Sequence, residues 1–139
     1  MARGTFSHPN EKSEASMTPI QSIKAGDRRV ANIFEASFTP FVYPDGGSDG
    51  DAILQLDSGL PLGVGFHVYR MPAGLSTRPH AHNGNEQFLI LEGELIDNDG
   101  THYRKGDLVW LRSGTEHSSY TPNGCLLAVH IAGAETILE

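Results

Sequence analysis

Two histidines and a glutamate lie close together in a segment that is bounded by glycines, Gly74–Gly93. The histidines are His80 and His82, and side chains two residues apart on an extended strand point to the same side of it. Both imidazoles can therefore reach one point. The dipeptide Asn83-Gly84 favours a tight turn, which would bring Glu86 to the same point from the next strand. The segment predicts a metal site with two nitrogen donors and one carboxylate oxygen.

A second segment supplies a third histidine. It begins at Gly106, runs through apolar residues to Leu111, and turns at Ser113–Glu116 before His117. Taken alone, a histidine after a turn is more often structural, and His117 becomes the candidate for the fourth ligand because both segments match family motifs. Three imidazoles and one carboxylate, without a thiolate, suit one divalent transition metal per chain. Zn and Fe are the first choices, and Mn, Ni and Cu are the alternatives.

Length and composition set the fold class. The chain has 139 residues and a mass of 15.0 kDa, which suits one domain with its own core. Sixteen Gly and eight Pro separate short apolar runs, a pattern typical of many short strands joined by turns. We therefore expect an all-β fold in which the polar residues 1–19 form a flexible tail and residues 20–139 form a single domain.

Charge and cysteine content narrow the partners and the compartment. The formal net charge is −7, the pI is near 5.4 and basic residues form no run, so we expect neither nucleic acid nor a membrane surface as a partner. Cys125 is the only cysteine, which excludes an intramolecular disulfide, and we interpret it as a small buried apolar residue. No apolar stretch approaches the length of a membrane span, and the N-terminal residues lack the apolar core of a secretory signal. These features predict a cytoplasmic protein.

The segment that leads into the first histidines alternates in character. Over Gly63–Met71, Arg70 lies on one face with several apolar residues, and His67 and Tyr69 lie on the other. Alternation alone does not show which face points to the interior. Arg70 could anchor an oxyanion of a substrate or pair with an acidic neighbour, or His67 and Tyr69 could line the pocket instead.

Two further segments, Gln87–Leu91 and Gly106–Leu111, are apolar on both faces. Such a strand is covered on both sides, and in a small domain the second cover is often another subunit, so we expect a homodimer. Phe88 is a candidate for the apolar wall of a substrate pocket. Trp110 is expected to fill the core, with a place in the pocket wall as the alternative.

The remaining segments carry weaker signals. Residues 92–103 predict a hairpin with a turn at Asn98-Asp99-Gly100, and His102 on its returning arm is expected to be exposed. His130 lies in an apolar run, where it could be a core histidine or line the pocket. We expect Glu135–Glu139 to form a loose end or an edge strand.

The spacing of both segments resembles that of the cupin family. Residues 74–93 follow the first cupin motif, which is Gly, five residues, His-x-His, three residues, Glu, six residues and Gly, and residues 106–121 follow the second. The chain departs from the second motif at Arg112, where cupins usually have Pro, and at Thr121, where they often have Asn. The resemblance implies a small β-barrel of the jelly-roll type, the double-stranded β-helix, with metal ligands His80, His82, Glu86 and His117.

More narrowly, residues 86–131 resemble the cupin domain of ChrR-type anti-sigma factors and their free-standing relatives. The likeness rests on three stretches: Glu-Gln-Phe-Leu-Ile-Leu-Glu-Gly-Glu-Leu, Asp-Leu-Val-Trp-Leu-Arg and Asn-Gly-Cys-Leu-Leu-Ala-Val-His. The relatives include zinc-binding sensor domains and, by resemblance of fold, Fe(II) dioxygenases that cleave β-dicarbonyl or related carbon–carbon bonds. The resemblance therefore implies two classes of function.

The first class is a metal-dependent dioxygenase that acts on a small carbonyl or acid substrate, and the second is a zinc-binding sensor or small-ligand-binding module. Four protein ligands fill a tetrahedral zinc site, whereas an octahedral ion keeps two positions open for chemistry. The best-known dioxygenases of this kind hold iron with histidines alone, so Glu86 is a departure. ChrR-type proteins also carry a zinc-binding anti-sigma domain whose Cys and His pattern is missing before Ile20, which favours the enzyme. A third hypothesis, a metal that only stiffens the barrel, predicts no pocket beside the ion.

Overall fold

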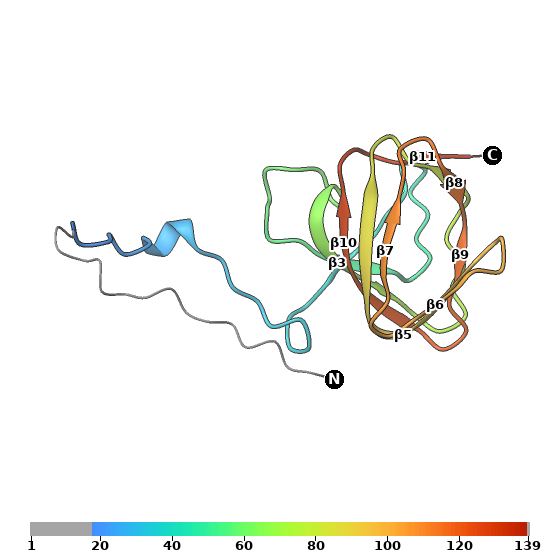
Figure 1. Cartoon of the computed structure of the whole chain (residues 1–139), viewed down its shortest axis with the longest axis horizontal. Coiled ribbons are helices and arrows are strands. Elements are labelled where there is room, and N and C mark those ends of the chain that lie inside the picture. Colours follow the sequence, from blue (N-terminus) through green and yellow to red (C-terminus); the bar gives the residue numbers. More distant parts are fainter. Residues whose placement is uncertain (1–17, 139) are drawn as a thin grey trace.

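The computed structural model describes residues 18–138, and their strands form two antiparallel sheets (Figure 1). The strand order is β1-β2-β3-β10-β5-β6 in the larger sheet, where β7 and β9 also pair with β5, and β11-β4-β8 in the smaller one. The strands are β1 (Thr39–Pro40), β2 (Ala52–Leu54), β3 (Gly65–Met71), β4 (His80–Ala81), β5 (Glu86–Asp97), β6 (His102–Arg104), β7 (Leu108–Leu111), β8 (Glu116–His117), β9 (Ser119–Tyr120), β10 (Cys125–Ile131) and β11 (Thr136–Ile137).

The all-β class predicted from the sequence is confirmed. The helical residues within 18–138 are limited to one 3₁₀ turn, η1 (Ala25–Asp27). No helix among these residues is long and apolar enough to cross a membrane.

The core lies on the inner face of β3, β10 and β5. β10 pairs with both neighbours, so that Val129 stands opposite His67 on one side and Phe88 on the other. Residues directly opposite one another in antiparallel strands share a face. The inward side chains join one buried apolar cluster, which consists of Met71, Leu75, Phe88, Ile90, Leu95, Cys125, Leu127, Val129 and Ile131. Removing these side chains from water is the main term that stabilises the fold.

β5 is longer than its partners and connects two parts of the sheet. Its first half pairs with β10 and β7, and its second half pairs with β6 and β9. The change occurs near Gly93, beside a register shift between Leu126 and Leu127. Gly93 has a φ of +79°, and a Cβ atom on it would lie 2.0 Å from the carbonyl oxygen of Gly124. Only glycine therefore fits where the strand changes partners.

The two sheets are consistent with the predicted jelly roll, but the strands of residues 18–138 do not close into a barrel. The strands of the smaller sheet pair only with each other, and within residues 18–138 no named strand of one sheet pairs with a strand of the other. Each of these strands contributes only two residues. Pro79 precedes β4 and has no N–H to donate, and Asn83-Gly84 turns the chain soon after β4 ends, which keeps the ladder short.

Trp110 lies on the outer face of the larger sheet and not in the core, contrary to expectation. Its side chain is 51% exposed, and Leu108 on the same strand is 74% exposed. Trp110 stands opposite Gln87, while the alternate residues Val109 and Leu111 pack against the core. Because β7 is apolar at every position, alternation could not show which of its faces points inward.

The first described residues extend away from the sheets (Figure 1). Ile20, Val30 and Phe34 are 97%, 83% and 68% exposed. The segment is tied to the body by the Arg29 side chain, whose Nη1 donates to the Leu56 carbonyl at 2.5 Å. The flexible tail predicted over residues 1–19 lies outside the described residues except for its last two.

The close approach at Gly93 generates a stability prediction. Gly93→Ala should lower the free energy of unfolding by about 3 kcal/mol or more, because the new methyl group meets the Gly124 carbonyl in addition to the cost of a positive φ. Gly100→Ala is the matched control, since Gly100 has a φ of +87° but no atom within 4 Å of its added Cβ. The control should cost only about 1–2 kcal/mol. Urea unfolding measures both variants. Equal urea midpoints would show that the added methyl group does not clash with the Gly124 carbonyl.

Candidate metal centre

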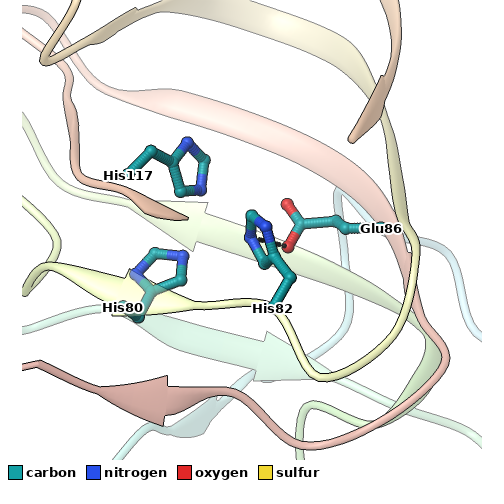
Figure 2. Close-up of side chains that lie close together, drawn as sticks. All are labelled: His80, His82, Glu86 and His117. Carbon is teal, nitrogen blue, oxygen red and sulfur yellow. Dashed lines mark ion pairs between the residues drawn. The ribbon is translucent and has the colours of Figure 1, made fainter. Parts of the chain in front are cut away.

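The structure brings together the four residues that the two motifs single out. One donor atom from each of His80, His82, Glu86 and His117 lies within 4.8 Å of the other three, and Figure 2 shows the side chains pointing toward a common centre. His80, His82 and Glu86 are buried, and His117 is half-buried. This cluster could hold a metal ion.

The smaller sheet and its connection to β5 position these side chains. His80 of β4 stands directly opposite His117 of β8, and their ring centroids are 4.6 Å apart. His82 continues the pairing beyond β4, since its N–H donates to the Thr115 carbonyl at 2.9 Å. The turn at Asn83-Gly84 then leads to Glu86, the first residue of β5. The local order that the sequence predicted, two histidines, a turn and a carboxylate on the next strand, is present.

Hydrogen bonds fix the orientation of the first two imidazoles. His80 Nδ1 lies 2.8 Å from the carbonyl oxygen of Arg78, which can only accept, so His80 Nδ1 carries the proton. His82 Nδ1 lies 2.9 Å from Thr115 Oγ1, whose own proton is donated to the Arg112 carbonyl at 2.7 Å. His82 Nδ1 must therefore also be the donor. Both rings leave the Nε2 lone pair free for a metal ion.

The third imidazole is held by Asp97 at the end of β5. His117 Nδ1 lies 3.0 Å from Asp97 Oδ2, which also accepts a hydrogen bond from the Tyr103 hydroxyl at 2.8 Å. The Ser119 hydroxyl donates to the other carboxylate oxygen at 2.5 Å. A carboxylate that donors fix on both oxygens holds the ring of His117 in one orientation, which is the usual arrangement behind a metal-bound histidine.

Burial and charge act differently on the histidines. Burial lowers the pKa of His80, since the imidazolium ion loses its hydration. Burial also acts to lower the pKa of His117, but the hydrogen bond and negative charge of Asp97 outweigh it and raise this pKa. Burial acts to raise the pKa of Asp97, yet hydrogen bonds from His117 and Ser119 lower it overall. A metal ion needs neutral His117, so binding displaces protons and weakens as the pH falls through the pKa of His117.

Two buried atoms of the cluster test whether a cation fits. His82 Nε2 and Glu86 Oε2 are 3.1 Å apart, and neither has a hydrogen-bond partner of acceptable geometry among the described residues. Because the proton of His82 is on Nδ1, both atoms present lone pairs to each other. Two buried acceptors in contact are unfavourable unless a cation lies between them. The donor set and these two atoms therefore fit a divalent ion.

A cavity of about 260 Å³ lies beside the cluster, between the two sheets. His80, Glu86 and His117 form one part of its lining. Most of the remaining wall is apolar and includes Phe41, Ile53, Phe88, Leu95, Leu127, Val129 and Ile131. The cavity also reaches His67 and Tyr69, and the Tyr69 hydroxyl donates to the Asp51 carboxylate. A small, largely apolar molecule could therefore reach the cluster.

The structure separates the three pocket candidates. Phe88 is buried and lines the cavity. Arg70 is exposed on the opposite face of β3, where its guanidinium lies 4.4 Å from the centre of the Phe38 ring. Trp110 is on the outer face of the larger sheet. The face of β3 that carries His67 and Tyr69 therefore points into the cavity, and the face that carries Arg70 does not.

The sequence did not reveal two acidic residues near the cluster. Asp97 contacts His117 but stands twenty positions away from it in the chain. Glu135, expected in a loose end or an edge strand, has its Oε1 atom 3.5 Å from His80 Nε2. Burial and the nearby charge of Glu86 raise the pKa of Glu135 to about 9. Neither residue belongs to a spacing motif, and only the tertiary fold brings them to the site.

Comparisons with known proteins agree with this architecture. A family model described as the ChrR cupin-like domain matches residues 62–133, which is more than half of the chain. No protein of curated function matches the chain in sequence.

Solved structures show the same fold at low sequence identity. An acetylacetone dioxygenase from Acinetobacter johnsonii is similar with a TM-score of 0.63 and 17% identity, over 88% of this chain and 85% of that one. The polyketide cyclase RemF from Streptomyces resistomycificus is similar with a TM-score of 0.62 and 18% identity, over 81% of this chain and 86% of that one. The complex of SigE with the anti-sigma ChrR from Rhodobacter sphaeroides is similar with a TM-score of 0.54 and 18% identity. The match covers 76% of this chain but only 51% of the matched chain. These likenesses establish the fold.

The role of Asp97 can be tested through metal affinity. Asp97→Asn should raise the dissociation constant for Co²⁺ by roughly 10- to 100-fold, because the amide orients and polarises His117 less well. Isothermal titration calorimetry at neutral pH measures the change. Asp99→Asn is the control, because Asp99 is exposed and its hydrogen bond goes to the backbone of Thr101. Equal affinities for the Asp97 and Asp99 variants would contradict the role given to Asp97.

Proposed function

The chain belongs to the ChrR cupin-like family, and on this premise we propose that it is a metal-dependent oxidoreductase of the dioxygenase type. The substrate class is a small carbonyl or acid compound whose remaining part is apolar. The observation that carries the proposal is the cavity beside the cluster, because a metal that only stiffens the fold needs no such space.

His80, His82, Glu86 and His117 would hold the ion, which we take to be one divalent transition metal per chain, Fe or Zn first. A bound ion of this kind polarises a carbonyl or carboxylate oxygen that coordinates to it. The three imidazoles are neutral donors whose free nitrogens are fixed by the contacts of their Nδ1 atoms. Glu86 adds one negative charge, which partly neutralises the ion and tempers its attraction for an anionic substrate.

The cavity selects the substrate by size and polarity. Its volume of about 260 Å³ is small compared with pockets that hold drug-sized ligands, so we expect a compound of few carbon atoms. Phe88, Leu127 and Val129 form an apolar wall from β5 and β10 that excludes water from the reacting end. The acetylacetone dioxygenase of similar fold makes β-dicarbonyl compounds the first probes for this chain.

A second candidate function is a zinc-binding sensor or small-ligand-binding module. The family match itself favours this candidate, together with the fold shared with the anti-sigma ChrR. Four protein donors are sufficient to fill a tetrahedral zinc site, and the cavity would then bind a ligand without turnover. The two functions differ in whether oxygen is consumed.

Oxygen consumption tests the proposed activity. Protein purified without chelators and loaded with Fe²⁺ should consume oxygen in proportion to added acetylacetone or a related β-dicarbonyl. His82→Ala should lower the rate by roughly 100-fold or more, because a missing ligand costs more than the 10- to 100-fold seen for its supporting partners. The exposed variant Lys105→Ala should keep the rate. Stoichiometric zinc, with no oxygen uptake after exchange to iron, would contradict the enzyme and favour the sensor.

We also propose that two copies of the chain pair through the outer face of the larger sheet. Phe66, Leu108 and Trp110 are 67%, 74% and 51% exposed on this face. The register places Phe66 and Trp110 in one row across four strands, with His130 and Gln87 between them. Large exposed apolar side chains grouped on one face in this way are typical of a surface that binds another protein.

The pairing predicts a concentration-dependent mass. Leu108→Glu should convert a dimer into a monomer in size-exclusion chromatography with light scattering, because a charge would be buried in the apolar interface. Val30→Glu is the control, since it changes an exposed apolar residue that precedes the first strand of the sheet. A monomeric wild-type protein at high micromolar concentration, or a dimeric Leu108→Glu variant, would exclude this interface.

A further inference from the structure

A second carboxylate lies against the four-residue cluster. Glu135 Oε1 is 3.5 Å from His80 Nε2 and 4.0 Å from His82 Nε2, the two nitrogens that are free for a metal ion. The carboxyl group of Glu86 is near enough for its charge to raise the pKa of Glu135. The side chain of Glu135 is 25% exposed. Glu135 therefore lies beside two of the candidate histidines and near Glu86.

The segment that carries Glu135 is fixed to the turn between β4 and β5. The side-chain amide of Asn83 donates to the Ala134 carbonyl and to Thr136 Oγ1, each at 2.7 Å. A Cβ atom on Gly84 would lie 2.9 Å from Ala132 Cβ, so glycine allows the segment to pass close to the turn. Immediately after Glu135, β11 pairs with β4, where Ile137 stands opposite His80. Contacts on both sides of Glu135 thus hold its carboxylate near the cluster.

The charges of this arrangement favour a cation. Two ionised carboxylates would repel each other in this partly buried place, which is why burial and Glu86 raise the pKa of Glu135 to about 9. The imidazoles of His80 and His82 direct lone pairs and not N–H groups toward the two carboxyl groups. A divalent ion would balance the two negative charges and accept the nitrogen lone pairs at the same time. Carboxylate oxygens suit the harder divalent ions, such as Mn²⁺, better than the soft ones.

We propose that Glu135 is a fifth donor of the metal centre, a second carboxylate that binds the ion together with Glu86. The inference rests on the proposed metal centre and deepens it. Glu135 also lines the cavity. The same carboxylate therefore meets any molecule that enters, and a chelating substrate would compete with it for the ion.

Cobalt binding tests the proposal without reference to turnover. Glu135→Gln should raise the dissociation constant for Co²⁺ by roughly 10- to 100-fold and alter the visible absorption of the Co²⁺ complex, because the donor set loses one oxygen. Glu92→Gln is the matched control, since Glu92 is an exposed glutamate farther along β5. Its affinity and spectrum should equal those of the wild type. Identical spectra and affinities for the wild type and Glu135→Gln would overturn the proposal.

A second variant keeps the test informative if Glu135→Gln unfolds. Asn83→Ala leaves the carboxylate in place but removes the two hydrogen bonds that fix its segment, so it should weaken Co²⁺ binding less than Glu135→Gln does. Circular dichroism of the metal-free proteins shows whether each variant is folded. If the wild-type protein binds no Co²⁺, the metal centre itself fails. If the wild type binds Co²⁺ and both variants keep its affinity, Glu135 is not a donor, although the metal centre itself stands.

Discussion

The arrangement of the site depends on hydrogen bonds to the Nδ1 atoms of three imidazoles. Each Nδ1 faces an oxygen, which is the Arg78 carbonyl for His80, the Thr115 hydroxyl for His82 and the Asp97 carboxylate for His117. In the neutral rings these contacts place the proton on Nδ1, which leaves every Nε2 lone pair for the centre of the cluster. The Glu86 carboxylate then lies among acceptors. A cation at this point would bind both the Glu86 oxygen and the nitrogen lone pairs, whose contact with each other is otherwise unfavourable.

The jelly roll serves this geometry in two ways. The smaller sheet is made of very short strands, yet it sets His80 opposite His117 and brings β11 alongside β4. The larger sheet supplies the apolar wall of the cavity and, through the long strand β5, both Glu86 at its start and Asp97 at its end. One strand therefore contributes a candidate ligand and the carboxylate that orients another. We propose that the exposed outer face of the same sheet binds a second copy.

Local spacing carried most of what the sequence could predict. His80, His82 and Glu86 lie within one strand–turn–strand unit, so residue order alone indicated that they would meet. Alternation failed where a strand is apolar on both faces, which is why Trp110 was expected in the core. It also left the orientation of β3 undecided between Arg70 and the pair of His67 and Tyr69. Asp97 and Glu135 reach the site through tertiary contacts between distant segments, and no spacing rule identifies such residues.

The most direct test of the account is anomalous X-ray diffraction from crystals of the protein loaded with Zn²⁺ or Co²⁺. We predict one strong anomalous peak per chain, from an ion that is bound by the Nε2 atoms of His80, His82 and His117 and by an oxygen of Glu86. The bonds should be about 2.0–2.2 Å long. A peak at another place, or ligation through any Nδ1 atom, would contradict the central claim that the hydrogen bonds of this fold prepare one metal centre.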